Sequence, residues 1–166
     1  MFREMRRKRQ QLTEAECVEI LMRNTSGVLA VLGDDEYPYA VPISYVYEEK
    51  ALYFHCARSG HKIDAIKSCK KVSFCVIDQD DVVPQQYTTH FRSVIIFGRA
   101  SIVDDDDEMR TAIEKLAIKY NPTDSEANRD IVIKKEYALL RIVRIDIDHL
   151  TGKEAIELVK SKNMQR

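Results

Sequence analysis

Residues Leu52–Ser68 read LYFHCARSGHKIDAIKS, and the hydrophobic pattern changes within this stretch. An apolar run typical of a strand ends at His55, and after Gly60 the apolar residues return with helical spacing. The positive end of this helix and its free N–H groups would face a bound anion, and Lys62 would add a full charge. The junction is therefore predicted to be a phosphate cradle. Strand-to-helix turns are common, so the residues alone also fit a simple connection.

The composition is that of a globular protein without a dominant charge. The chain has 166 residues, 45% of them hydrophobic, and a formal net charge of -1 at pH 7. This length predicts a core that needs no disulfide or metal. The near balance of charges gives no indication of nucleic acid or membrane as a partner. No apolar run is long enough to span a bilayer, and the opening MFREMRRKRQ lacks the apolar segment of a signal peptide. We expect a cytoplasmic protein.

We expect a single domain over residues 1–166, with a basic N-terminal arm at 1–12 and a C-terminal tail at 153–166. The basic residues of the arm are Arg3, Arg6, Arg7, Lys8 and Arg9. Such a run is found in nucleic-acid-binding arms and also in solvated or partner-wrapping termini. The second interpretation is favoured because the run is short and no stacking aromatic residues interleave it.

Two groups of residues raise the question of a metal. The cysteines form no CxxC pair and lie at Cys17, Cys56, Cys69 and Cys75. Reduced thiols are the simplest interpretation. Cys56, however, lies in the junction between His55 and Gly60, which leaves a role as a metal ligand or nucleophile open. The acidic run at residues 104–108 precedes apolar residues with helical spacing, and carboxylates stabilise the first turn of a helix. We therefore predict no metal site.

The remaining patterns predict a mainly β protein of the α+β type. Thr13 and Glu16 form a capping box that begins a helix at about residues 14–24, and further helices are expected after the acidic run and at about 125–135. Strands are expected at 27–32, 37–47, 51–55, 71–78, 87–103 and 138–148. Gly98 indicates a bend or bulge in the long fifth strand. The fold class is a six-stranded antiparallel barrel with flanking helices.

The strand predicted at residues 37–47 contains two prolines, which cannot donate ladder hydrogen bonds. It is therefore either an edge strand or a strand interrupted by a bulge near Pro42. A bulge would leave the backbone groups of Val41, Ile43 and Ser44 free for a ligand. An ordinary edge strand explains the same prolines without a ligand.

Five segments, in this order, resemble the flavin-binding split-barrel family related to pyridoxamine 5'-phosphate oxidase. They are AVPISYVY, LYFHCARSGHKIDAIKS, KVSFCVID, TTHFRSVIIFGRASIVDDDDE and RIDIDHLTGKEA. The resemblance runs from about residue 1 to residue 155 and is greatest to the nitroimidazole-resistance branch. It implies an FMN-binding split β-barrel that forms a homodimer, with FMN, or FAD in its place, between the subunits.

The resemblance also implies which residues hold the cofactor. It puts the flavin phosphate and ribityl chain against two short segments, made of His55, Cys56 and Ala57 and of Gly60, His61 and Lys62. It puts the isoalloxazine ring beside the backbone of Val41, Pro42, Ile43 and Ser44. A neighbouring strand would bring Phe91, Arg92 and Ser93 close to the same ring.

The reaction implied is the reduction of a nitro group on a small-molecule electron acceptor by reduced FMN. His61 or His55 is the candidate for binding the acceptor or supplying a proton near neutral pH, although either fits a structural hydrogen-bond role equally well. His90 and His149 are interpreted as structural. No nicotinamide motif is present, so the electron donor is unknown. Other functions on the same fold are a redox carrier or sensor with little turnover, a pyridoxamine-phosphate oxidase and a haem-binding relative.

Overall fold

The chain is built around one antiparallel sheet of seven strands. A computed structural model describes residues 2–164 and gives the strand order β2-β1-β5-β6-β7-β4-β3. The strands are β1 (Ser26–Leu32), β2 (Pro38–Ser44), β3 (Val46–Glu48), β4 (Ala51–Ala57), β5 (Lys71–Val83), β6 (Thr88–Ile102) and β7 (Leu140–Glu154). The predicted class, a mainly antiparallel β protein with flanking helices, is confirmed.

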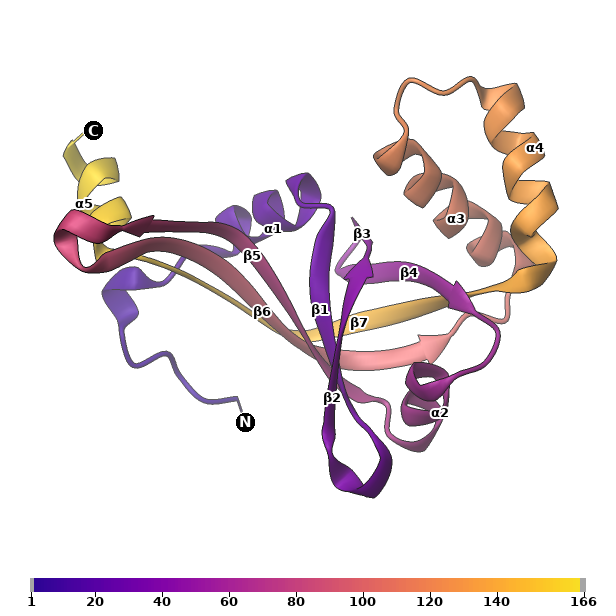
Figure 1. Cartoon of the computed structure of the whole chain (residues 1–166), viewed down its shortest axis with the longest axis horizontal. Helices are drawn as coiled ribbons and strands as arrows, with labels where there is room; N and C mark the ends of the chain where they lie inside the picture. Colours follow the sequence, from indigo (N-terminus) through magenta and orange to yellow (C-terminus); the bar gives the residue numbers. More distant parts are fainter. Residues whose placement is uncertain (1, 165–166) are drawn as a thin grey trace.

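In the described part of the chain, five α-helices flank the sheet. They are α1 (Glu14–Arg23), α2 (His61–Ser68), α3 (Asp106–Tyr120), α4 (Glu126–Glu136) and α5 (Ile156–Met164). Helices α3 and α4 form a pair at the end of the molecule where β4 ends, and α5 lies at the opposite end, beside the turn between β5 and β6 (Figure 1). Within residues 2–164 no helix has the length and apolar character needed to cross a membrane.

The prediction of six strands was wrong, because the segment expected as one strand at 37–47 forms both β2 and β3. Tyr45 separates them, and its N–H donates a hydrogen bond of 2.8 Å to the hydroxyl of Tyr120 instead of to a neighbouring strand. β2 is an edge strand, which accommodates its prolines. Its register with β1 runs without a shift from Pro38 to Ser44, so of the two alternatives the edge strand is confirmed and the bulge near Pro42 is wrong.

The sheet is curled. β2 and β3 lie at opposite ends of the strand order, yet only Tyr45 separates them in the chain. The two edges must therefore approach each other, and β2 does contact β4. No ladder joins β2 to β3 or β4 in the part of the chain that the structure describes, so hydrogen bonds do not close the sheet into a barrel. The curled sheet encloses the main core, in which Tyr45, Phe54 and Phe74 are the largest fully buried side chains.

β6 is irregular where the sequence predicts it. Its register with β7 shifts between Phe97 and Gly98. A Cβ atom at Gly98 would lie 2.3 Å from the carbonyl oxygen of Asp146, so only glycine permits this close backbone approach. The irregularity that the sequence predicts at Gly98 is confirmed, and the extra residue at this point is Asp148 of β7.

Residues 10–12, before α1, pack against the end of β7. The buried side chain of Gln10 donates a 2.9 Å hydrogen bond to the carbonyl of Glu154, and the N–H of Leu12 donates one of 3.0 Å to Gly152. The segment predicted as a tail at 153–166 instead contains the end of β7 and helix α5. Residues 1, 165 and 166 of the predicted arm and tail lie outside the described residues.

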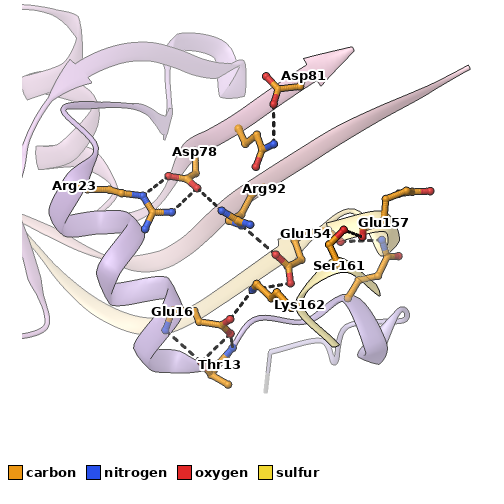
Figure 2. Close-up of polar contacts among 12 residues, drawn as sticks. Thr13, Glu16, Arg23, Asp78, Asp81, Arg92, Glu154, Glu157, Ser161 and Lys162 are labelled. Carbon is orange, nitrogen blue, oxygen red and sulfur yellow. Dashed lines mark hydrogen bonds and ion pairs between the residues drawn. The ribbon is translucent and has the colours of Figure 1, made fainter. Parts of the chain in front are cut away.

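A chain of ion pairs joins α1 and α5 across strands β5, β6 and β7. It passes in order through Arg23, Asp78, Arg92, Glu154, Lys162 and Glu16 (Figure 2). The N–O distances along this ion-pair chain range from 2.5 to 3.3 Å. Asp78 is the extra residue at a register shift of β5 against β6. A bulge of this kind re-aims a side chain, and here the Asp78 carboxylate reaches cations from two elements.

Candidate functional site

A cavity of about 620 Å³ lies between the ends of β2 and β4 and the α3–α4 pair. Its volume falls within the range of roughly 300–1,000 Å³ that is usual for small-molecule sites. The strand side of the cavity consists of Ser44, His55, Cys56 and Ala57. The helix side is mainly aliphatic, with Tyr120 and Glu136 as its polar members. Four residues predicted to bind the cofactor therefore share one cavity.

The end of β4 presents uncharged groups to this cavity. His55 is exposed to solvent over part of its surface, yet its partial desolvation, with a further contribution from the positive charge of Lys62, lowers the pKa of His55 from its ordinary value. Burial raises the pKa of the Cys56 thiol, although Lys62 opposes this shift. Neutral imidazole and neutral thiol are thus the favoured forms near pH 7. Lys62 is not itself among the residues that line the cavity; it lies in the first turn of α2, five residues after Ala57, and its charge acts on both His55 and Cys56.

The start of α2 has the local geometry of an anion cradle. Gly60 is the N-cap, with φ 129° and ψ 171°, a conformation essentially restricted to glycine. Its carbonyl accepts hydrogen bonds from the N–H groups of Ile63 at 2.8 Å and Asp64 at 3.1 Å. No side chain caps the helix, so its first N–H groups remain available to an anion beside Lys62.

The two candidate catalytic histidines lie in different surroundings. His55 lines the cavity, whereas His61 is not among the residues that line it. The ring of His61 stacks on Tyr39 with a centroid distance of 4.2 Å, and its Nε2 atom lies 3.8 Å from a carboxylate oxygen of Asp34. His61 therefore faces the turn between β1 and β2.

The predicted ring-binding segment lies on edge strand β2, next to the cavity. Ser44 lines the cavity, while Ile43 is buried in the main core and Val41 packs against it. Pro42 is exposed. Because β2 is paired on one side only, this segment presents free backbone groups along its outer edge without the predicted bulge.

Residues Phe91–Ser93 lie far from the cavity of their own chain. Ser93 pairs with Lys153 of β7, whereas His55 pairs with Ile142 near the other end of the same strand. About eleven strand residues separate these positions, a path of roughly 35 Å along β7, and the start of β6 and the end of β4 lie at opposite ends of the molecule (Figure 1). The guanidinium of Arg92 is moreover held between Asp78 and Glu154 (Figure 2). One chain does not bring this segment to the other predicted site residues.

The prediction missed the helix side of the cavity. Tyr120 fastens the end of α3 to the junction between β2 and β3, where its hydroxyl accepts from Tyr45 N–H and contacts the carbonyl oxygens of Thr25 and Tyr45. The wall residues Ile113 and Leu116 have the helical spacing of an ordinary core face. Apolar spacing alone does not distinguish a face that lines a cavity from one that is packed.

Comparison with known proteins gives a family and a shared fold. The family model described as pyridoxamine 5'-phosphate oxidase matches residues 13–154. No curated protein matches the chain. A candidate 5-nitroimidazole antibiotic resistance protein from Bacteroides thetaiotaomicron is 20% identical, with a TM-score of 0.73 over 87% of this chain and 86% of that one.

Two further solved structures are similar. A conserved hypothetical protein from Mycobacterium tuberculosis is 18% identical, with a TM-score of 0.78 over 91% of this chain and 90% of that one. An FAD-binding protein from Mesorhizobium loti is 24% identical, with a TM-score of 0.60 over 88% of this chain and 97% of that one. At these identities the structures establish a common fold. Because the family model covers most of the sequence, the chain belongs to the pyridoxamine 5'-phosphate oxidase family.

Proposed function

We propose that the protein binds FMN, or FAD in its place, in the cavity between β4 and the α3–α4 pair. One observation carries the proposal: Ser44 and the His55–Ala57 segment line one cavity, beside the uncapped start of α2 and the charge of Lys62. A flavin needs apolar surroundings for its flat ring, a few polar groups at the ring edge and a fixed positive site for its phosphate. The description of the Mesorhizobium loti protein as FAD-binding supports the same cofactor class.

The residues present fit such a cofactor. The first N–H groups of α2 and the Lys62 ammonium would hold the phosphate, and the strand side near Ser44 would border the ring. A bound flavin supplies the electron transfer, while the chain binds and orients the acceptor. We propose that the acceptor is a small nitro compound of the nitroimidazole kind, which makes the protein an oxidoreductase. The candidate resistance protein from Bacteroides thetaiotaomicron supports this choice.

We further propose that the active form is a homodimer. Phe91–Ser93 lie at the far end of β7 from His55, so these residues reach a flavin only if a second copy presents them. A second copy would also cover exposed sheet edges. The cytoplasmic location expected from the sequence stays a prediction.

His55 is the stronger candidate for a direct role, because its side chain lines the cavity whereas that of His61 stacks on Tyr39. The pKa of His55 is lowered by burial and by Lys62. Its protonated form therefore becomes populated only at a pH below the usual histidine value. If His55 donates a proton to the acceptor, the rate rises as the pH falls, and His55→Ala removes this rise while His61→Ala retains it.

The test is a single anaerobic experiment on the FMN-loaded protein. The bound flavin is reduced with one equivalent of dithionite, and a nitroimidazole is then added while the visible flavin band is recorded. We expect the band to return as the nitro compound is consumed, and the matching imidazole without a nitro group to leave the flavin reduced. A flavin that stays reduced with both compounds contradicts nitro reduction and favours the redox carrier. A protein that takes up no FMN contradicts the proposal that FMN is its cofactor.

A further inference from the structure

The helix side of the cavity exposes an aliphatic surface that contains one acid. α4 continues into the short 3-10 helix η4 (Tyr137–Leu139), and three of the lining residues are Val132, Glu136 and Leu139. Their spacing is close to i, i+4 and i+7, which places them on one face. Val132 is 51% exposed and Leu139 is 65% exposed, so packing within the chain does not bury either side chain. This face is free to contact a ligand.

Glu136 is exposed to solvent and is not held in place by polar contacts with the described part of the fold. It is the last residue of α4, where a carboxylate opposes the helix dipole. Its side chain makes no hydrogen bond or ion pair with any other residue between 2 and 164. Arg58, in the loop after β4, donates a 2.8 Å hydrogen bond to the carbonyl of Ala138, which ties this loop to η4. That contact holds the Glu136 segment against the strand side.

The two sides of the cavity differ in their fixed charge, although the Arg58 guanidinium is hydrogen-bonded to Ala138 on the helix side. The strand side lies beside the Lys62 charge and the free N–H groups of α2, which favour a phosphate. The Glu136 carboxylate repels a phosphate and attracts a cation. A flavin phosphate is accordingly assigned to the strand side, and the aliphatic face with Glu136 remains for the second ligand of the reaction.

We propose that the face made by Val132, Glu136 and Leu139 selects aromatic acceptors that combine an apolar ring with a positive charge. It rejects anionic acceptors, and Glu136 is the specificity-determining residue. The inference rests on the proposed function, because it assigns the strand side to the flavin. Repulsion of the wrong charge is an efficient way to discriminate between ligands of the same shape. The Val132 and Leu139 side chains supply apolar contact that does not depend on charge.

The test uses three probes with the same nitrobenzyl frame: para-nitrobenzyl trimethylammonium, para-nitrobenzyl alcohol and para-nitrobenzoate. Their dissociation constants for the FMN-loaded protein are measured by isothermal titration calorimetry, which needs no turnover. We expect the cation to bind best and the anion worst. Glu136→Gln should reduce the ratio of the affinity for the cation to the affinity for the anion by about three- to tenfold, the size expected for a solvent-exposed charge. Added salt should narrow the same ratio in the parent protein.

Glu126→Gln is the matched control, because it removes the same charge from the exposed start of the same helix, outside the cavity. It should leave the ratio unchanged. The thermal unfolding midpoint of Glu136→Gln should equal or slightly exceed that of the parent protein, since the carboxylate makes no stabilising contact with the described residues and opposes the helix dipole. Equal affinity for cation and anion, or an unchanged ratio in Glu136→Gln, overturns the inference even if FMN binds and nitro groups are reduced. Failure to bind FMN overturns the proposed function and this assignment together.

Discussion

The hydroxyl of Tyr120 accepts a 2.8 Å hydrogen bond from the backbone N–H of Tyr45. Tyr45 is the residue through which the chain passes from one end of the strand order to the other. The contact therefore fastens α3 to the point where the two edges of the curled sheet meet. Since Tyr120 also lines the cavity, the same hydroxyl fixes the helix wall relative to the strand side.

Tyr120→Phe removes this contact and leaves the N–H of Tyr45, a residue whose exposure is 0%, without its partner. The free energy of unfolding should fall by about 1–3 kcal/mol, the cost of an unsatisfied buried donor. Urea unfolding measures the change. The control is Tyr37→Phe, because Tyr37 is 75% exposed and its hydroxyl should contribute nothing. Equal stability of the two variants would show that the Tyr120 hydroxyl does not hold the junction.

Gly60→Ala tests the start of α2. A Cβ atom at this position meets nothing within 4 Å, so any effect comes from the backbone angle φ of 129°. Alanine in this conformation costs about 1–3 kcal/mol, and the helix start should rearrange to avoid it. We expect a lower unfolding midpoint in urea and weaker FMN binding. Ser59→Ala in the same loop is the control, and a Gly60→Ala protein that equals it in both measurements would contradict the cradle geometry.

The ion-pair chain should make the fold sensitive to acid. The hydrogen bond from Lys162, followed by that from the N–H of Thr13, lowers the pKa of Glu16 from 4.5 to about 2. Burial opposes ionisation of Asp78, but hydrogen bonds from Arg23 and Asn24 outweigh it and lower its pKa as well. A carboxylate with a lowered pKa in the folded state contributes stability above its unfolded pKa and loses it as the pH falls.

Glu16→Gln separates this charge effect from helix capping, because glutamine preserves the capping box with Thr13. The variant should be less stable than the parent protein at pH 7, and the difference should shrink as the pH falls from 4.5 toward 2. Urea unfolding at a series of pH values measures both curves. Glu36→Gln, in the exposed turn between β1 and β2, is the control. A stability difference that stays constant with pH would contradict a charge effect.

The features that sequence predicted well depend on neighbours along the chain. The capping box of Thr13 and the irregularity at Gly98 are set by local backbone chemistry. The strand end at His55 and the helix beginning at His61 follow from a change in hydrophobic period within a few residues. Local signals of this kind do not require knowledge of distant contacts.

The features that were missed depend on distant contacts or weak patterns. The strand break at Tyr45 is held by a residue 75 positions away, so the alternating pattern through Tyr47 gives no sign of it. Helix α5 was missed because none of its residues is fully buried, and a helix without a buried face has little apolar periodicity. In the sequence Glu136 has the same pattern as any exposed acidic residue of a helix, and only the fold shows that it lines a cavity.

The most direct test of the flavin site is an equilibrium titration with FMN, monitored through the flavin absorbance and fluorescence. Lys62→Ala removes the charge beside the start of α2, and Lys67→Ala removes an exposed charge from the last turn of the same helix. We expect the parent protein and Lys67→Ala to bind FMN equally and Lys62→Ala to bind about ten- to a hundredfold more weakly, as for loss of a charge-assisted contact. A parent protein that binds no FMN, or a Lys62→Ala protein that binds as tightly as Lys67→Ala, would contradict the proposed phosphate site.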